Sequence, residues 1–220
     1  MYLRKSVFTL LLILWIICLL SIVGLPLVAQ NIVYSNLKDL LAHDGDTVTA
    51  LKIEKRTKNN ISLSGGADYK ISADTDKSLC KYLKKRCFAV QEDTSLYINC
   101  KKLRYKRLRF GGWYAPAMWV NGNIFFSAIP IGVVAASSSV TMDVTLGGVV
   151  GDAIAASSLV SKRVYYEIDA TTGKIDFVGR DRMCALLDSY PEWKEAYLNE
   201  NSESAETTGK YLRLLKTAKK

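Results

Sequence analysis

The sequence contains little of what metal and thiol chemistry requires. It has one histidine and five cysteines in 220 residues, and no two cysteines stand in a Cys-x2-Cys spacing or in a cluster with histidine. This excludes the common zinc motifs and the dithiol motif of thiol exchange. The single histidine, His43, lies in a turn beside Asp44 and Asp46, where a lone histidine is usually a surface residue. We therefore expect no metal site.

Motifs of the common catalytic chemistries are also missing. The sequence has no Gly-x-Ser-x-Gly elbow, no phosphate-binding Gly-x4-Gly-Lys-Ser/Thr loop and no His-Glu-x2-His pair. The Asp-Gly-Asp at 44–46 resembles the start of a calcium loop but lacks the later ligands. Asp143 and Asp152 would point to opposite sides of a helix, so they are poor candidates for an acid–base pair unless the chain bends between them. We expect no catalytic residue and no cofactor, and a non-enzymatic protein.

The chain opens with a hydrophobic leader. Two basic residues precede a charge-free apolar stretch from Val7 to Val23, a Gly–Pro break follows, and then comes the small residue Ala29. These are the parts of a secretory signal, which predicts a signal peptide over residues 1–29. The alternative is an uncleaved anchor formed by residues 6–30, because about 20 apolar residues span a bilayer. Both place the rest of the chain outside the cytoplasm, either in the periplasm or at the outer membrane, or anchored in the inner membrane.

A second apolar run covers residues 131–160 and consists mostly of small side chains. Asp143 and Asp152 lie within it, and each carboxylate would cost about 2.5–3.5 kcal/mol at a bilayer centre, which argues against a membrane span. Its small residues at helical spacing favour a closely packed Gly/Ala-rich helix over 147–160, after a bend near 137–146. The alternative is a mobile flap that inserts at a membrane surface or covers a groove.

Cysteine use fits an exported protein. Removal of the leader leaves four cysteines, Cys80, Cys87, Cys100 and Cys184, an even number in an oxidising compartment. Cys87 and Cys100 flank a predicted hairpin whose turn is centred on Asp93-Thr94, which would set them opposite each other within disulfide reach. The pairing stays open, as does the alternative of four free buried thiols.

The pattern of strand and turn signals predicts an α+β fold. Asn121-Gly122 between two apolar runs is a strong hairpin signal that sets Trp119 opposite Ile124 and Met118 opposite Phe125. Pro116 lacks an amide donor, which favours an edge or bulged position for the first of these strands. A further hairpin is predicted with Gly173 in its turn.

The remaining segments complete this small sheet of antiparallel hairpins. Earlier in the chain we expect a short capped helix after Ser35, one strand over 47–56, two short strands around Gly65-Gly66, and a helix over 74–87. Three short helices are predicted at the C-terminus, with Tyr211, Leu212 and Leu215 on one face of the last. The predicted domains are therefore an α+β domain over 30–179 and a C-terminal helical extension over 180–220.

The strongest positive signal is charge. Residues 81–109 hold ten basic side chains against Glu92 and Asp93, so this segment carries nearly all of the net charge of +9. Concentrated positive charge attracts anionic partners. The predicted anion-binding residues are Lys84, Lys85, Arg86, Lys101, Lys102, Arg104, Lys106, Arg107 and Arg109.

The second half of this basic segment has an alternating pattern. As a strand, residues 101–110 would place Lys102, Arg104 and Lys106 on one face. Leu103 and Tyr105 would share the other face with Arg107 and Arg109. Trp113, Tyr114 and Trp119 follow and are candidates for a ligand-binding platform, although aromatic side chains in an apolar hairpin are more often core residues.

Two functions fit this pattern. The first is an envelope-associated binding or structural protein whose basic face contacts an anionic component, namely a lipid headgroup, lipopolysaccharide, an acidic glycan or an acidic protein surface. Nucleic acid is not the expected partner, because the leader directs the chain out of the cytoplasm. The second is a small-ligand or lipid carrier whose cavity is lined by the aromatic hairpin and closed by the Gly/Ala segment.

Several linked phrases also carry a resemblance. They include "GDTVTALKIEKRTKN", "LCKYLKKRCFAV", "LYINCKKLRYKR", "GWYAPAM" and "GGVVGDAIAASSLVSKRVYYEID". Over residues 30–180 the chain resembles an uncharacterised family of exported proteins of Bacteroides-type bacteria, a domain of unknown function. The resemblance implies export and a single domain, and it implies no activity or site residue.

Overall fold

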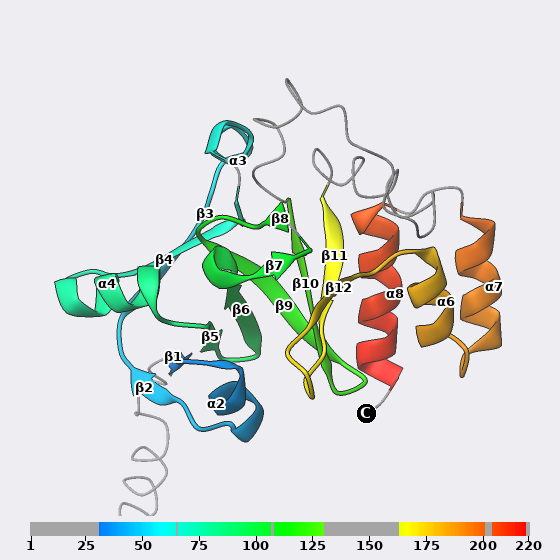
Figure 1. The fold of residues 1–220 in the computed structure, drawn as a ribbon, viewed down its shortest axis with the longest axis horizontal. Coiled ribbons are helices and arrows are strands. Elements are labelled where there is room, and N and C mark those ends of the chain that lie inside the picture. Colours follow the sequence, from blue (N-terminus) through cyan, green and yellow to red (C-terminus); the bar gives the residue numbers. More distant parts are fainter. Residues whose placement is uncertain (1–30, 65, 107, 130–162, 201–203, 219–220) are drawn as a thin grey trace, which may run out of the picture.

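The strands that the structure describes form one antiparallel sheet of ten strands, with a separate two-stranded hairpin. In a computed structural model, which describes residues 31–64, 66–106, 108–129, 163–200 and 204–218, the sheet follows the order β12-β11-β10-β9-β6-β5-β1-β2 (Figure 1). A side branch of β3 and β4 joins it at β9. The strands are β1 (Asn31–Tyr34), β2 (Asp46–Val48), β3 (Leu51–Lys55), β4 (Tyr69–Ala73), β5 (Ala89–Glu92), β6 (Ser95–Asn99), β7 (Arg104–Tyr105), β8 (Leu108–Arg109), β9 (Tyr114–Val120), β10 (Asn123–Ala128), β11 (Val164–Ile168) and β12 (Ile175–Phe177).

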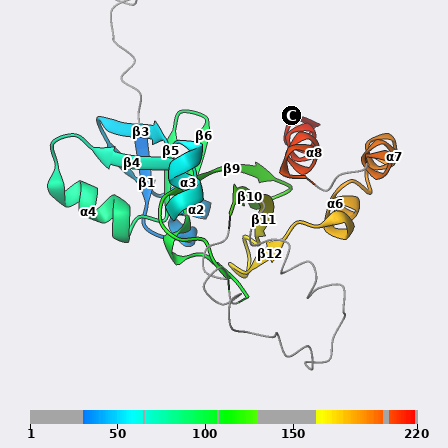
Figure 2. The same cartoon turned by 90° about the horizontal axis from the view of Figure 1, so that it is seen from above.

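The helices lie mainly at the two ends of this sheet. They are α2 (Leu37–Ala42), α3 (Lys58–Ser64), α4 (Lys77–Lys85), the 3-10 helix η1 (Cys100–Lys102), α6 (Arg180–Leu186), α7 (Pro191–Asn199) and α8 (Ala205–Ala218). Figure 2 shows α4 at one end of the molecule and the group α6–α8 at the other. None of the helices within the described ranges is both long and apolar enough to cross a membrane. The α+β class predicted from the sequence is confirmed, with a larger sheet than expected.

Residue alternation along β9 divides the core between the two faces of the sheet. Tyr114 and Val120 point to one face, where they join apolar clusters that include Leu83 of α4 and Leu212 of α8. Ala115 points to the other face and joins the cluster that α2 and the β7–β8 hairpin cover. The helices α4 and α8 therefore pack on the same face, at opposite ends of it.

β9 lies inside the sheet, so the expectation that its strand is an edge is wrong. Residues 114–117 of β9 pair with β6, residues 117–120 pair with β10, and Ala117 belongs to both registers. Pro116 lies opposite Tyr97 of β6 and just before the first residue paired with β10. The proline is tolerated because it lies where the strand changes partners and its missing donor falls outside the β10 register.

The hairpins predicted from turn signals are confirmed. Trp119 lies opposite Ile124 and Met118 opposite Phe125, and both turn residues between them, Asn121 and Gly122, have positive φ. The hairpin of β5 and β6 turns at 93–94, and that of β11 and β12 has a positive-φ glycine at 173. The two-residue turns at 121–122 and 93–94 fix the register of their strands, whereas the connection from β11 to β12 is longer and spans residues 169–174.

Two expectations in the first third of the chain are wrong. The single strand expected over 47–56 is two strands, because β2 pairs with β1 whereas β3 pairs with β4 and the chain bends at Ala50, which has a φ of 58°. The first of the two strands expected around Gly65-Gly66 is the helix α3. The Thr57 carbonyl accepts a bond from the Ile61 amide at 3.1 Å, which begins this helix.

The remaining helix predictions are confirmed where the structure describes them. Asp76 caps α4 by accepting bonds from the amides of Ser78 at 2.7 Å and Leu79 at 3.0 Å. Proline begins α7, and Tyr211, Leu212 and Leu215 of α8 are all buried. The predicted leader and the predicted Gly/Ala-rich helix over 147–160 lie outside the described residues.

Candidate functional site

An asparagine joins the two halves of the basic segment. The side-chain amide of Asn99 donates to the Leu83 carbonyl at 3.0 Å and to the Cys87 carbonyl at 2.9 Å, at the C-terminal end of α4. Its side-chain oxygen accepts a bond from the Lys101 amide at 3.1 Å, which begins η1. Asn99 is buried, so these bonds hold the end of α4 against η1. Basic residues that are far apart in sequence, at 84–86 and 101–102, are therefore brought to one place.

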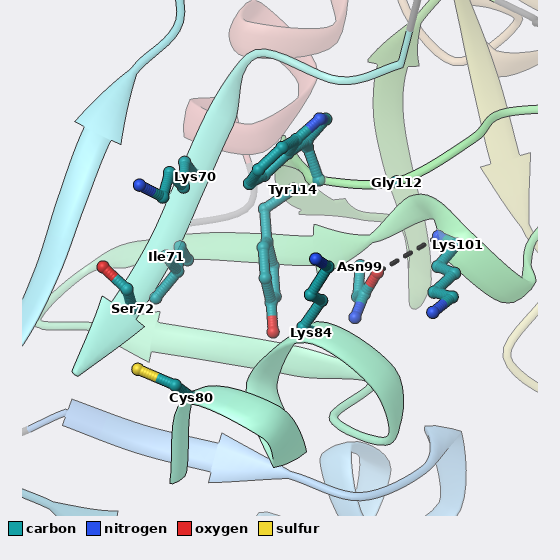
Figure 3. Close-up of a pocket in the computed structure, with 10 residues that line it drawn as sticks. Lys70, Ile71, Ser72, Cys80, Lys84, Asn99, Lys101, Gly112 and Tyr114 are labelled. Atoms are coloured by element: carbon teal, nitrogen blue, oxygen red, sulfur yellow. Dashed lines mark hydrogen bonds between the residues drawn. The ribbon is translucent and has the colours of Figure 1, made fainter. Parts of the chain in front are cut away.

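A pocket of about 500 Å³ lies beside this junction, between α4, β4 and the start of β9 (Figure 3). Its size is in the range of small-molecule sites. Apolar side chains and three lysines contribute to its lining. The lining residues are Lys70, Ile71, Ser72, Cys80, Lys84, Asn99, Lys101, Gly112, Trp113 and Tyr114.

The lysines of this pocket differ in how they are placed. Lys84 extends from α4 toward Tyr114 and Asn99, whereas Lys70 points away toward β3 (Figure 3), where its ammonium lies 3.7 Å from the Glu54 carboxylate. Neither Lys84 nor Lys101 forms an ion pair with a carboxylate of the described residues. Both side chains are exposed to solvent, so two uncompensated positive charges from different elements stand at the pocket.

Trp113 enters the pocket from a strained backbone. Its φ is 81°, in the left-handed region that bulky residues rarely adopt. The Cys100 amide donates to the Trp113 carbonyl at 2.9 Å, and the guanidinium of Arg56 lies 5.1 Å from the centre of the indole ring. Strain of this kind persists only where the surroundings impose it, and it gathers at functional sites.

Tyr114 forms an apolar wall of the pocket rather than a chemically active group. The residue is buried, and its hydroxyl donates to the Leu83 carbonyl at 2.8 Å. Burial raises the pKa of this hydroxyl well above its ordinary value. The phenol therefore stays protonated and offers its ring to the pocket.

The second half of the basic segment is a hairpin, so the single strand expected over 101–110 is wrong. η1 is followed by β7 and β8, with Lys106 at positive φ in the turn. Lys102, Arg104, Lys106 and Arg109 are all exposed, and Leu103, Tyr105 and Leu108 are buried. The turn reverses the chain, which is why Arg109 lies on the solvent side and not with Leu103 and Tyr105.

The structure thus places the predicted site residues in three groups. Lys84, Lys101, Trp113 and Tyr114 line the pocket. Lys85, Arg86, Lys102, Arg104, Lys106 and Arg109 are exposed outside it, and Arg107 lies outside the described residues. Trp119 is absent from the described lining and packs against the core cluster on the opposite face of the sheet.

The predicted disulfide does not form. Cys80, Cys87, Cys100 and Cys184 are all free thiols. Cys87 and Cys100 lie just beyond the paired ends of β5 and β6, where the chain enters a turn on one side and η1 on the other. Their side chains join apolar clusters on opposite faces of the sheet, and each thiol donates to a backbone carbonyl, of Ala89 and Ile98 respectively.

Several residues of the site could not be identified from the sequence. In the sequence Asn99 is only the last residue of a predicted strand, and its role depends on the three hydrogen bonds of its side chain. Ile71 and Ser72 belong to β4, a strand predicted only as a short segment after a glycine pair, and Gly112 has no local signal at all. His43 has a structural position, as the exposed left-handed C-cap residue of α2.

Fold and pocket together define an α+β protein with a lysine-flanked apolar pocket. Residues 32–219 match the Family of unknown function (DUF6563), and the chain belongs to that family. No curated protein and no solved structure matches the chain. The resemblance to an uncharacterised family is therefore confirmed, and export and a Bacteroides-type origin stay predictions.

Proposed function

We propose that this protein is a non-enzymatic binding protein of the cell envelope that holds an anionic component at the pocket between α4, β4 and β9. The observation that carries the proposal is that Lys84 and Lys101, two lysines without carboxylate partners among the described residues, line one pocket together with apolar side chains. Both ammonium groups are exposed to solvent and have no carboxylate partner in the described ranges to lose, so an anionic group on the apolar wall would gain charged hydrogen bonds with them.

The exposed cations around the pocket extend this positive surface. Lys85, Arg86 and Lys102 flank the two pocket lysines in sequence, and the β7–β8 hairpin adds Arg104 and Arg109. Such a surface attracts anions over a distance of about a Debye length and falls in effect as salt rises. In this proposal the surface brings the partner to the pocket, and the pocket selects it.

The leader supports a location outside the cytoplasm, with residues 1–29 removed or residues 6–30 retained as an anchor. Anionic lipid headgroups, lipopolysaccharide phosphates and acidic glycans are abundant there, and acidic protein surfaces are also present. The second candidate function, a small-ligand or lipid carrier, is favoured by the pocket volume of about 500 Å³. A lipid that copurifies with the protein, detected by mass spectrometry of an organic extract, would distinguish a carrier.

A matched pair of double variants tests the proposal. Lys84→Gln with Lys101→Gln removes the two pocket charges, and Lys85→Gln with Lys102→Gln removes two neighbouring charges on the same helices. The probe is a short-chain phosphatidylglycerol present as monomers, with binding measured by calorimetry at two salt concentrations. We expect the pocket variant to lose affinity at least about tenfold, since each lost charged hydrogen bond is worth roughly 1.5–3 kcal/mol, and the neighbouring variant to lose little. Equal losses in both variants, or no loss in either, would overturn the proposal.

A further inference from the structure

The polar side chains inside the pocket are already hydrogen-bonded to the protein. Both donors of the Asn99 amide and the Tyr114 hydroxyl are engaged with carbonyls at the end of α4. The Cys80 thiol donates to the Ala73 carbonyl at 2.9 Å and accepts from the Ala73 amide at 3.3 Å. These groups form a satisfied surface that has little left to offer a polar ligand.

Few polar groups of the pocket remain available to bind a ligand. The Ser72 hydroxyl is not one of them, because its side chain lies on the same side of β4 as Lys70 and points away from Tyr114 and Lys84 (Figure 3). The Ala73 backbone faces away from β3, so the alternation of an antiparallel ladder turns the Ile71 backbone the same way. The ammonium groups of Lys84 and Lys101 complete the set. Two charges and the polar backbone of one residue match one acidic head, and they are too few for a ligand with hydroxyls along its whole length.

The apolar part of the pocket is built to be rigid. Ile71 and Tyr114 are buried parts of the cluster beneath α4. Trp113 is fixed by its backbone bonds on one side and by Arg56 over its ring. Preorganised apolar walls gain affinity from each apolar group that they bury, because no ordering of the protein is required first.

We infer that the ligand is a single-headed anionic amphiphile, whose apolar body lies against Ile71, Trp113 and Tyr114 while its acidic group reaches Lys84 and Lys101. This inference rests on the proposed function and narrows it. Of the anionic components available outside the cytoplasm, it selects fatty or aryl acids and lipid-like phosphates over acidic glycans. A sugar acid in this pocket would bury hydroxyls that find no partner, which opposes binding.

The test compares two families of soluble acids on the full-length protein. Hexanoate, octanoate and decanoate form a series with one head and a growing apolar body, and glucuronate and glucose 6-phosphate are anions with polar bodies. We expect affinity to rise about fourfold for each buried methylene, and decanoate to bind at least about tenfold more tightly than either sugar. The Lys84→Gln, Lys101→Gln variant should weaken the whole acyl series by the same factor.

Cys80 supplies an independent readout of where the ligand binds. Its half-buried thiol lines the pocket, and the half-buried Cys184 of α6 serves as the internal control. Decanoate should slow alkylation of Cys80 by iodoacetamide and leave Cys184 unchanged, as followed by peptide mass spectrometry. Sugar acids that bind as tightly as decanoate, with the same dependence on Lys84 and Lys101, would overturn this inference and leave the proposed function standing. Acids whose binding is independent of both lysines would overturn both.

Discussion

Gly66 lies against the backbone that positions Trp113. A methyl group added at Gly66 would stand 2.7 Å from the Gly112 carbonyl oxygen, and the φ of Gly66 is +87°. The same carbonyl accepts a bond from the Ala67 amide at 3.3 Å. The absence of a side chain at Gly66 is therefore a requirement for the strained conformation that follows at Trp113.

Substitution of Gly66 by alanine should destabilise the protein and disturb the pocket. A left-handed conformation costs an alanine about 1–2 kcal/mol, and the contact with the Gly112 carbonyl should add about 1–3 kcal/mol. Gly122→Ala is the matched control, since its φ is +85° and nothing lies within 4 Å of the added methyl. Urea unfolding of both variants measures the difference, and equal losses would show that the close approach is unimportant.

The buried thiols predict a loss of stability in alkaline solution. Burial raises the pKa of Cys87 to about 11 and that of Cys100 to about 12, from an ordinary value of 9.0. Above pH 9 the unfolded chain releases these protons while the folded chain keeps them, so stability is complete below pH 9 and falls as the pH rises toward 12. Each group contributes a slope of up to about 1.4 kcal/mol per pH unit.

Cys100→Ala should make this decline shallower, measured by urea unfolding between pH 8 and pH 11. The buried tyrosines contribute to the slope equally in both proteins, so the difference isolates the thiol. Parallel declines in the two proteins would contradict the prediction, as would a Cys87–Cys100 disulfide found in the native protein by mass spectrometry.

The basic residues of the pocket could be predicted from the sequence, but the asparagine that positions them could not. Lys84 and Lys101 were both identified, because clustered charge is visible in any linear pattern. Asn99 was not, since three hydrogen bonds to backbone groups leave no trace in composition or periodicity. The Cys87–Cys100 pairing failed for a related reason: the strand register was right, but pairing stops before both cysteines and their side chains turn to opposite faces.

Among the elements, α6 is fixed to the paired strands β10 and β11 by a buried carboxylate. Glu167 of β11 accepts two bonds from the Arg182 guanidinium, at 2.7 and 2.6 Å, and one from the Asn123 amide at 2.6 Å. The carboxylate side chain is 6% exposed and that of Arg182 is 43% exposed. The bidentate pair therefore satisfies a charge that has little access to water.

Arg182→Met should destabilise the protein by about 2 kcal/mol, because it leaves the Glu167 carboxylate buried with one remaining partner. The exposure of Arg182 places this value toward the lower part of the range for buried pairs. Lys194→Met is the control, since Lys194 pairs with Asp188 at 2.6 Å on the surface and should contribute about 0–1 kcal/mol. Thermal unfolding of both variants checks the order, and a larger loss in the surface variant would refute it.

Elements marked by a turn or cap residue could be predicted from the sequence. Elements whose bounds depend on which strand they pair with could not. Asn121-Gly122 specifies a turn by itself, and Asp76 specifies the start of α4. The residues over 47–56 read as one strand because nothing local shows that β2 and β3 pair with different neighbours. The hairpin of β7 and β8 was missed because each strand has two residues, too few for an alternating pattern to show a reversal.

For the whole molecule, the C-terminal helices share their core with the sheet. Leu212 of α8 is fully buried in a cluster with Val120 of β9 and Phe125 of β10. The chain therefore buries one face of β9 and β10 under α8, whose Leu212 comes 92 residues after Val120 and 87 residues after Phe125. The predicted boundary at residue 180 separates segments that are in direct contact.

Leu212→Ala should lower the free energy of unfolding by about 2–5 kcal/mol, the range for leucines truncated to alanine in a packed core. Leu198→Ala provides the comparison, because Leu198 of α7 is 42% exposed and should change stability by less than about 0.5 kcal/mol. A single unfolding transition shared by circular dichroism and tyrosine fluorescence is expected in both variants. A separate early transition in the Leu212 variant would show that the helices unfold independently of the sheet.

The sequence predicted the α+β class of the whole molecule but not the order of its strands. Hairpins can be predicted from the residues of their turns. The pairing of β9 with β6 joins two hairpins, and it depends on contacts that no turn specifies. The pocket exists because of that pairing, since β4 and β6 both reach the first residue of β9.

β9 is shared by the two halves of the sheet, with Ala117 as the residue common to both registers. Loss of the β9–β6 pairing would open the half of the sheet that carries the pocket. Loss of the β9–β10 pairing would open the half beneath α8. The pocket wall at Tyr114 and the contact with α8 at Val120 therefore both depend on one strand of seven residues.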